Sequence, residues 1–229
     1  IRGDDHLVNA ARQSQLYTAF GWNIPVYAHI PLIHGSDGSK LSKRHGALAV
    51  SSYKDMGFLP DSLQNYLLRL GWSHGDDEII TMSQAIKWFD LKQVGKSAAR
   101  FDLDKLESLN AHYLQNLSTL KALDIIVSGL SKEFGKSVSS KQKEALKRGM
   151  PGLLSRAKTI TNLVDSAQFY VAKRPIPLDE KAKKILLKPG LSAVLGQILS
   201  ALEEIKQWKA SNIESEIRDF AELSDVKLG

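Results

Sequence analysis

The sequence predicts a mainly α, multidomain protein in which a short α/β part precedes a long run of helices. A β-branched and aromatic stretch, Val26 to Ile30, predicts one extended segment that ends at Pro31. From Ser51 onward, apolar residues recur at helical spacing and are interrupted by Gly or Pro. A chain of 229 residues can hold one large or two ordinary domains, which agrees with this division.

The N-terminal part is expected to contain one helix before the extended segment. Apolar residues from Leu7 to Phe20 follow a helical pattern that Gly21 closes, with Asp4 or Asp5 as the N-cap. The extended segment then runs into a loop rich in glycine and serine. Parallel α/β sheets place ligands where a strand runs into such a loop, so a binding site is expected there.

Four helices are expected between residues 51 and 113, and each has its own start signal. The start residues are Ser51 or Ser52, Pro60, Thr81, and Asp102 or Asp104. Gly57 is expected to stop the first of these helices, and Gly71 to cap the C-terminus of the second.

The remainder of the chain is expected to be helical as well. A domain boundary is expected between Tyr113 and Ser118. Beyond it, the apolar pattern predicts helices near residues 120–134, 141–149, 152–171, 179–187, 191–209 and 213–223. Their breaks coincide with Gly135, Pro151 and the Pro189-Gly190 pair, among others.

The composition excludes several kinds of site. The chain has no cysteine, so disulfides, thiolate zinc sites and cysteine nucleophiles are excluded. The 6 histidines are scattered without a metal-ligand spacing, and no structural metal is expected. No apolar run is long enough to cross a bilayer, so no membrane partner is expected.

The charge favours a polyanionic partner. The formal net charge is +6, and basic residues cluster within residues 131–159 and again within 173–188. Two consecutive clusters suit contacts with an RNA backbone, which act without base specificity. The alternative is an ordinary solvated helical surface, which is the commoner explanation for any single lysine.

The segment from His34 to Ala49 carries the strongest chemical signal. Glycines and serines at 35, 36, 38 and 39 leave backbone N–H groups free, and three cations follow within five positions. The cations are Lys40, Lys43 and Arg44. Such a loop suits a polyphosphate whose charge must be neutralised during reaction, although a solvated loop is the alternative.

The order Lys40-Leu41-Ser42-Lys43-Arg44 resembles the KMSKS signature of class I aminoacyl-tRNA synthetases. The order and spacing of the short motifs around it resemble those of bacterial glutamyl-tRNA synthetases. The resemblance is clear from Ile1 to about Tyr113 and looser from there to the end. The segments that carry this resemblance are Ile1–Leu7, His45–Ala47, Gly57–Pro60, Leu70–Glu78 and Ala99–Asp102.

The resemblance implies three regions. Residues 1–50 are expected to be the C-terminal part of an α/β nucleotide-binding (Rossmann-like) catalytic domain that carries the KLSKR loop. Residues 51–115 are expected to form a stem-contact helical domain, and residues 116–229 a truncated α-helical anticodon-binding domain. The His-Ile-Gly-His signature of the family does not occur. The chain is therefore expected to be a fragment without the N-terminal half of the catalytic domain and the extreme C-terminus, inactive by itself in aminoacylation.

The resemblance also assigns residues to the substrates. Lys43 is expected to act in catalysis on the α-phosphate as pyrophosphate leaves, with Lys40 as a second catalytic cation. Arg2 is expected to hold the glutamate carboxylate, although its place near the end of the chain also suits a frayed, exposed residue. The expected ATP-binding set is Lys43, Ser42, Arg44, Leu32, Ile33, Asp5 and His6.

Further residues are expected to contact tRNA. The resemblance is looser here: Arg156 and Thr159 match anticodon-contacting positions, and Arg156 is expected to contact a base edge. Lys158, Lys147 and Arg148 are expected to join them on the RNA surface. Phosphate contacts or plain surface positions are the alternatives.

The implied function is that of a glutamate–tRNA ligase, which activates glutamate with ATP and transfers it to the tRNA 3′ end. The expected partners are glutamate-accepting tRNA, L-glutamate and ATP with Mg²⁺. The parent enzyme is expected to be a cytoplasmic monomer. A glutaminyl-type synthetase is an alternative, which the helical C-terminal part opposes, and a noncatalytic tRNA-binding module is another.

Overall fold

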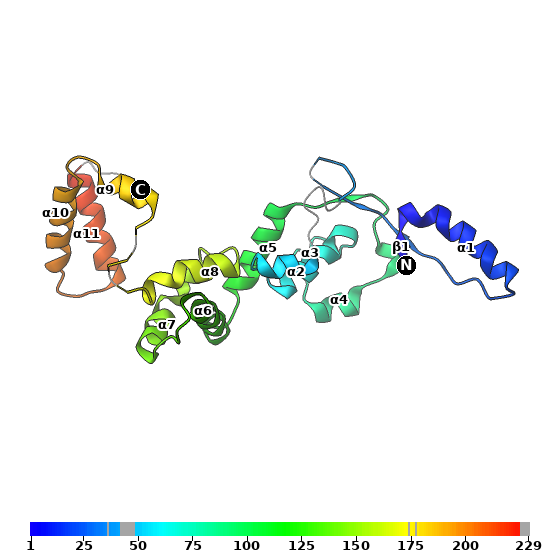
Figure 1. The fold of residues 1–229 in the computed structure, drawn as a ribbon, viewed down its shortest axis with the longest axis horizontal. Helices are drawn as coiled ribbons and strands as arrows, with labels where there is room; N and C mark the ends of the chain where they lie inside the picture. The colour runs from blue at the N-terminus through cyan, green and yellow to red at the C-terminus, as the bar shows by residue number, and fades with distance from the viewer. Residues whose placement is uncertain (36, 42–48, 174, 177, 225–229) are drawn as a thin grey trace. The chain divides into compact units, whose positions relative to one another are not determined.

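A computed structural model describes residues 1–35, 37–41, 49–173, 175–176 and 178–224 of the chain. The chain divides into two compact units, residues 1–172 and residues 173–229. Helices dominate both units, and the described strands are two residues long (Figure 1). The mainly α fold class is therefore confirmed.

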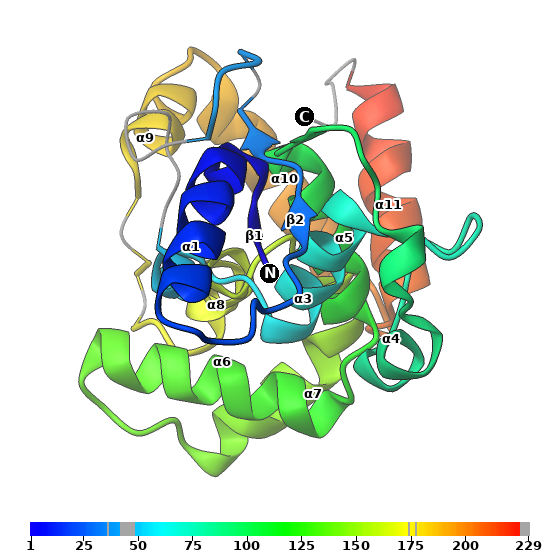
Figure 2. The same ribbon diagram turned by 90° about the vertical axis from the view of Figure 1, so that its right-hand side faces the viewer.

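Two short parallel strand pairs organise the N-terminal region. Strand β1 (Arg2–Gly3) pairs with β2 (His29–Ile30), and β3 (Ile33–His34) pairs with β4 (Ala99–Arg100). The 3₁₀ turn η1 (Asp4–His6) and helix α1 (Leu7–Ala19) connect β1 to the segment that leads into β2 (Figure 2). The extended segment expected at 26–30 is shorter as a strand, because only its last two residues meet a partner strand; Val26 is 98% exposed.

Two of the expected helix N-caps are wrong. The N-cap of α1 is His6, without a side-chain bond, because Asp4 and Asp5 lie one step earlier in η1. Helix α2 (Val50–Asp55) has Ala49 as its N-cap, so Ser51 and Ser52 lie inside its first turn rather than before it.

The helices that follow begin where the sequence predicts. Helix α3 (Pro60–Gly71) has Pro60 in its first turn. The Thr81 hydroxyl accepts from the Gln84 N–H at the start of α4 (Met82–Trp88), and Gln84 completes a capping box. After the 3₁₀ turn η3 (Leu91–Gln93), helix α5 (Leu103–Gln115) begins with Asp102, whose carboxylate accepts from the Lys105 N–H at 3.2 Å. Gly71 is the last residue of α3, with Trp72 after it in extended conformation, so the expected glycine cap is one residue off.

Helices α6 (Thr119–Phe134), α7 (Ser140–Leu154) and α8 (Ile160–Ala167) pack together, with the 3₁₀ turn η4 (Gln168–Tyr170) after them (Figure 1). Leu114, Ile126, Leu130, Leu146 and Leu163 are completely buried among them. Gly129 allows a close approach of α6 and α8, because a Cβ there would lie 2.6 Å from a Val164 methyl group.

The break expected at Pro151 is wrong. Helix α7 runs through Pro151 to Leu154, and the chain turns only before Thr159, which caps α8. The burial of Met150, Leu153 and Leu154 in the same core explains this continuation, since packing on both sides of the proline offsets its missing N–H.

A buried polar group joins the helices on either side of residue 115. Asn110 of α5 is completely buried; its Oδ1 accepts from the Leu59 N–H at 2.8 Å and from the Ser62 hydroxyl at 2.6 Å. Its side-chain amide donates to the Lys158 carbonyl at 2.5 Å. Nearby, the Gly57 carbonyl accepts from the Ile160 N–H at 2.8 Å.

The second unit contains α9 (Glu180–Leu186), α10 (Leu191–Glu203) and α11 (Ala210–Leu223), with α10 and α11 in contact. Asp179 caps α9, and α10 ends six residues before the expected Lys209. In the described part of the chain, no single helix has the length and apolar character needed to cross a membrane; α9 and α10 pass that test only as a pair bent by 92°.

Candidate functional site

The described residues from Ile33 to Leu41 form a hairpin that continues from β3. The Leu41 N–H donates to the Ile33 carbonyl at 2.9 Å, and His34 bridges to Lys40 in antiparallel fashion. Within the turn, the Gly35 N–H donates to the Ser39 carbonyl at 2.9 Å, and Gly38 has a φ of 79°. A positive φ of this size is easy for glycine and strained for residues with a Cβ, so this turn depends on glycine at position 38.

The hairpin presents Lys40 to the 3₁₀ turn η1. The Lys40 ammonium donates to the Asp5 Oδ2 at 2.5 Å, and its side chain remains 56% exposed. This hydrogen bond lowers the pKa of Asp5 below its ordinary value, with the Lys40 charge acting in the same direction. The His6 Nε2 lies 4.0 Å from the other Asp5 oxygen. Lys40, Asp5 and His6 were all predicted from the sequence, and the structure brings them together.

Arg2 and Leu32 lie beside the Lys40–Asp5 ion pair. The Arg2 guanidinium donates to the Gln13 Oε1 at 2.8 Å, which ties β1 to α1. A Cβ on Gly3 would lie 3.4 Å from a Leu32 methyl group, so Leu32 faces the start of the chain. Ile33 instead pairs with Ala99 across β3 and β4, and both aliphatic residues are half-buried.

Ser42, Lys43 and Arg44 lie outside the described residues, so their predicted roles stay predictions. Among the residues that the structure describes, no three His, Asp or Glu side chains gather as metal ligands.

The predicted RNA contacts gather near the end of α7 and the start of α8. Arg148 and Arg156 line one cavity of about 520 Å³, together with Pro151, Phe169 and Tyr170. The Arg156 Nε donates to the Gly152 carbonyl at 3.2 Å, and Phe169 is 54% exposed. The cavity therefore combines two guanidinium groups with an accessible aromatic ring.

The other three predicted RNA contacts have local partners. Thr159 is buried, and its hydroxyl accepts from the Asn162 N–H at 3.1 Å as the N-cap of α8. The Lys158 ammonium lies 3.3 Å from the Glu107 Oε2, and that of Lys147 lies 3.8 Å from the Glu144 Oε2. Both lysines are exposed, but each carries a nearby carboxylate that an RNA phosphate would have to displace.

Sequence reasoning missed three residues near these sites. Gln13 and Asn110 are polar residues inside helices, which sequence patterns usually place on the surface. The one available signal for Asn110 was its spacing of four residues from both Leu106 and Leu114, which puts all three on the buried face of one helix. Arg100 follows a run without periodicity, so nothing in the sequence placed it beside the hairpin.

Comparisons with known proteins cover the whole chain. Residues 1–108 match the family model for tRNA synthetases class I (E and Q), catalytic domain, and residues 103–229 match that for the anticodon binding domain. The chain is 52% identical over 229 residues to glutamate–tRNA ligase 2 of Paramagnetospirillum magneticum, covering 48% of that protein. It is 48% identical over 229 residues to glutamate–tRNA ligase 2 of Parvibaculum lavamentivorans, covering 46% of it.

Solved structures give the same picture. A glutamate tRNA ligase from Elizabethkingia meningosepticum, crystallised in complex with its amino acid, superimposes with a TM-score of 0.71 at 29% identity over 99% of this chain and 48% of that one. A glutamate-tRNA synthetase from Elizabethkingia anophelis gives 0.70 at 31% identity over 100% of this chain and 48% of its own. The chain thus spans about half the length of the relatives that it matches.

Proposed function

This chain belongs to the class I glutamyl-tRNA synthetase family, and on that premise we propose that it forms part of a glutamate–tRNA ligase. In the proposed reaction, the glutamate carboxylate attacks the α-phosphate of MgATP, which gives glutamyl-adenylate and releases pyrophosphate. The terminal ribose of the tRNA then takes the glutamyl group and releases AMP. The half of the site that this chain supplies is the hairpin that meets the phosphates.

The hairpin cations act on the departing pyrophosphate in this proposal. Lys40 has an exposed ammonium whose acceptor is a carboxylate, and a phosphate oxygen is an equally suitable acceptor. The Lys43 ammonium binds the phosphate oxygens most strongly in the transition state, when negative charge builds up on the departing pyrophosphate. Ser42 and Arg44 hold the remaining phosphate oxygens. Mg²⁺ arrives with ATP as part of the substrate.

The neighbouring residues hold the nucleoside and the amino acid. Leu32 and Asp5 both lie beside Gly3 at the start of the chain, and His6 follows Asp5. Ile33 lies in β3 at the base of the hairpin and adds aliphatic surface there. Arg2 takes the glutamate carboxylate through its guanidinium fork, which now contacts Gln13.

The helical region takes tRNA. The cavity with Arg148 and Arg156 offers donors for a base edge or a phosphate, and Phe169 offers a ring on which an unpaired base can stack. Lys147 lies next to Arg148 on α7, and Lys158 precedes Thr159, the N-cap of α8. Binding there places the acceptor RNA on the same polypeptide as the phosphate hairpin.

One observation carries the proposal. The Lys40 ammonium, the first cation of the signature, extends from the hairpin to a residue of the predicted nucleotide site, at 2.5 Å from the Asp5 carboxylate. A solvated loop would not bring these two positions, 35 residues apart in sequence, into contact.

The test uses a chimera in which this chain replaces the matching segment of the Paramagnetospirillum magneticum relative. We expect the chimera to attach radiolabelled glutamate to glutamate-accepting tRNA in the presence of MgATP, and not to attach glutamine to glutamine-accepting tRNA. A folded chimera that charges neither tRNA, while the parent relative charges the first, would refute the proposal.

A noncatalytic tRNA-binding module is the second candidate, favoured by the net charge of +6. Calorimetry with the 229-residue chain separates the two. A ligase part binds both tRNA and MgATP, whereas a bare RNA module binds tRNA alone. We further propose a monomeric cytoplasmic parent enzyme, since tRNA charging serves protein synthesis there.

A further inference from the structure

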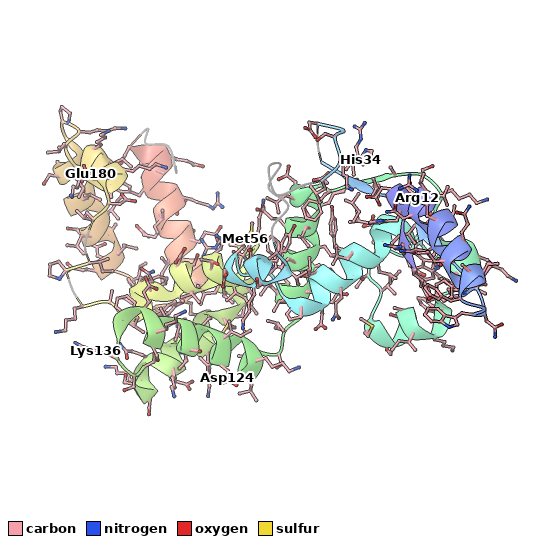
Figure 3. The ribbon with its side chains drawn as sticks, turned by 45° about the vertical axis from the view of Figure 1, so that its right-hand side comes forward. Arg12, His34, Met56, Asp124, Lys136 and Glu180 are labelled. Atoms are coloured by element: carbon pink, nitrogen blue, oxygen red, sulfur yellow. The ribbon has the colours of Figure 1, made fainter. Side chains whose placement is uncertain are left out.

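Arg100 lies beside the hairpin although it is 60 positions from Lys40 in the sequence. Strand β4 pairs with β3 in parallel, with His34 opposite Arg100, and the Phe101 N–H donates to the His34 carbonyl at 2.8 Å. This pairing fixes the Arg100 backbone at the base of the hairpin. Figure 3 marks His34 on β3, where the hairpin begins.

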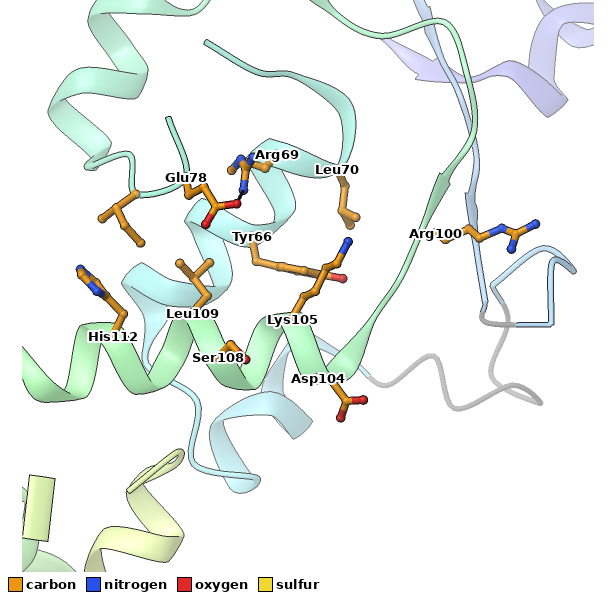
Figure 4. A pocket seen from close by; sticks show the side chains of 11 residues that line it. Tyr66, Arg69, Leu70, Glu78, Arg100, Asp104, Lys105, Ser108, Leu109 and His112 are labelled. Atoms are coloured by element: carbon orange, nitrogen blue, oxygen red, sulfur yellow. Dashed lines mark ion pairs between the residues drawn. The ribbon is translucent and has the colours of Figure 1, made fainter. Parts of the chain in front are cut away.

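The Arg100 side chain reaches the turn of the hairpin. Its Nη2 lies 3.8 Å from the position that a Cβ on Gly38 would take. Figure 4 shows the guanidinium extending from β4 away from Asp104 and toward the hairpin. Arg100 is exposed, and within the described part of the chain no carboxylate pairs with it.

The two cations flank β3 on opposite sides. Lys40 faces Asp5 and the start of the chain, where Leu32 also points. Arg100 comes from β4, which continues directly into α5 and the helical region. A phosphate group held by Arg100 would therefore lie at the hairpin turn on the side of β4 and the helical region.

A cavity of about 630 Å³ lies between α3 and α5, and Arg100 stands on its lining. Lys105 lines the same cavity and forms no ion pair with a carboxylate of the described residues, whereas Arg69 is paired with Glu78 at 3.6 Å. Asp104 is the remaining acidic residue of the lining. With Arg69 and Glu78 neutralising each other, Arg100 and Lys105 leave one positive charge in excess over Asp104.

We propose that Arg100 binds a backbone phosphate of the tRNA at the junction of the hairpin and the helical region. The inference rests on the proposed function, because it takes tRNA as the ligand. A guanidinium fork with no internal partner suits two phosphate oxygens at once, and the glycine turn beside it leaves room for the sugar–phosphate chain. The contact positions the RNA and carries no sequence preference.

The test measures tRNA binding to the 229-residue chain by fluorescence anisotropy over a series of salt concentrations. Arg100→Gln is expected to weaken binding about fivefold near physiological salt and to reduce the slope of log K against log salt by roughly 0.7–0.9, the contribution of one phosphate contact. Arg100→Lys retains the charge and is expected to keep the slope near that of the unsubstituted chain.

Arg12→Gln is the matched control, because Arg12 is an exposed arginine on α1 whose loss changes the net charge equally (Figure 3). The proposal is overturned if Arg100→Gln leaves the slope unchanged, if Arg12→Gln lowers it equally, or if Arg100→Gln weakens MgATP binding and not tRNA binding. Failure of the unsubstituted chain to bind tRNA at all would instead refute the proposed function. Circular dichroism and thermal unfolding check that both variants fold.

Discussion

Asp5 and Lys40 set the charge on one flank of the hairpin. In the structure the Lys40 ammonium donates to the Asp5 carboxylate at 2.5 Å, which holds the lysine beside a residue of the predicted nucleotide site. Because both side chains are largely accessible to solvent, the pair contributes little to stability, and its importance is positional.

The pKa of Asp5 provides a direct check of this contact. Its folded-state pKa is lowered from 3.8, chiefly by the hydrogen bond from Lys40, so the contact is present above pH 3.8 and is lost as the pH falls through the lowered value. We expect a carboxyl ¹³C titration by NMR to place the midpoint below 3.8, and Lys40→Met to move it upward toward 3.8. A midpoint that does not respond to Lys40→Met would show that the pair is not formed in solution.

An Arg156 substitution can show whether this guanidinium contacts an anticodon base or a backbone phosphate. If it contacts a base edge, Arg156→Gln should lower the affinity for cognate tRNA by about 1–3 kcal/mol and remove the penalty for substituting one anticodon base. Arg148→Gln, on the same cavity, serves as the comparison. Equal weakening for every anticodon, with a reduced salt slope, would make Arg156 a phosphate contact instead.

At the scale of elements, Asn110 connects α5 to α3 and to the turn before α8. Asn110→Ala would leave the Leu59 N–H and the Lys158 carbonyl without this partner in a completely buried place. We expect a loss of about 3 kcal/mol in the free energy of unfolding, measured by urea titration. Asn116→Ala, at the exposed end of the same helix, should cost about 1 kcal/mol or less. Similar values for both variants would contradict the role given to Asn110.

Local signals predicted some elements well. Thr81 and Asp102 each precede an apolar repeat at the right spacing, and the side chain of each accepts from the helix backbone as expected. The start of α6 and its end at Gly135, with a φ of 62°, could be predicted for the same reason.

Other features depended on contacts between distant residues. Ser51 has a side chain that can cap a helix, but the N-cap of α2 is Ala49. Asp5 also has such a side chain, but its carboxylate accepts from Lys40 instead. Pro151 remains inside α7 because its neighbours are buried, which single-residue propensity does not reveal. Likewise Lys40 could be chosen from its motif, whereas Arg100 became visible only through the pairing of β3 with β4.

At the scale of the molecule, the hairpin has little core of its own. Of the apolar side chains in the described part of residues 1–41, only Ala10 is buried, while Phe20, Trp22 and Val26 are exposed. The helical part from Tyr53 to Ala167 holds the large buried clusters instead. The hairpin is therefore positioned by its pairing with β4 and by the Lys40–Asp5 contact, and catalysis is best tested with this chain embedded in a larger polypeptide.

The most direct test of the central claim is tRNA-dependent ATP–pyrophosphate exchange by the chimera with the Paramagnetospirillum magneticum relative. We predict that Lys43→Ala lowers the exchange rate by about 100-fold or more, as expected when a preorganised charge is removed from a transition state, while tRNA affinity stays unchanged. Lys96→Ala, on the loop before β4, should exchange at the rate of the unsubstituted chimera. Normal exchange by the Lys43→Ala chimera would contradict the account.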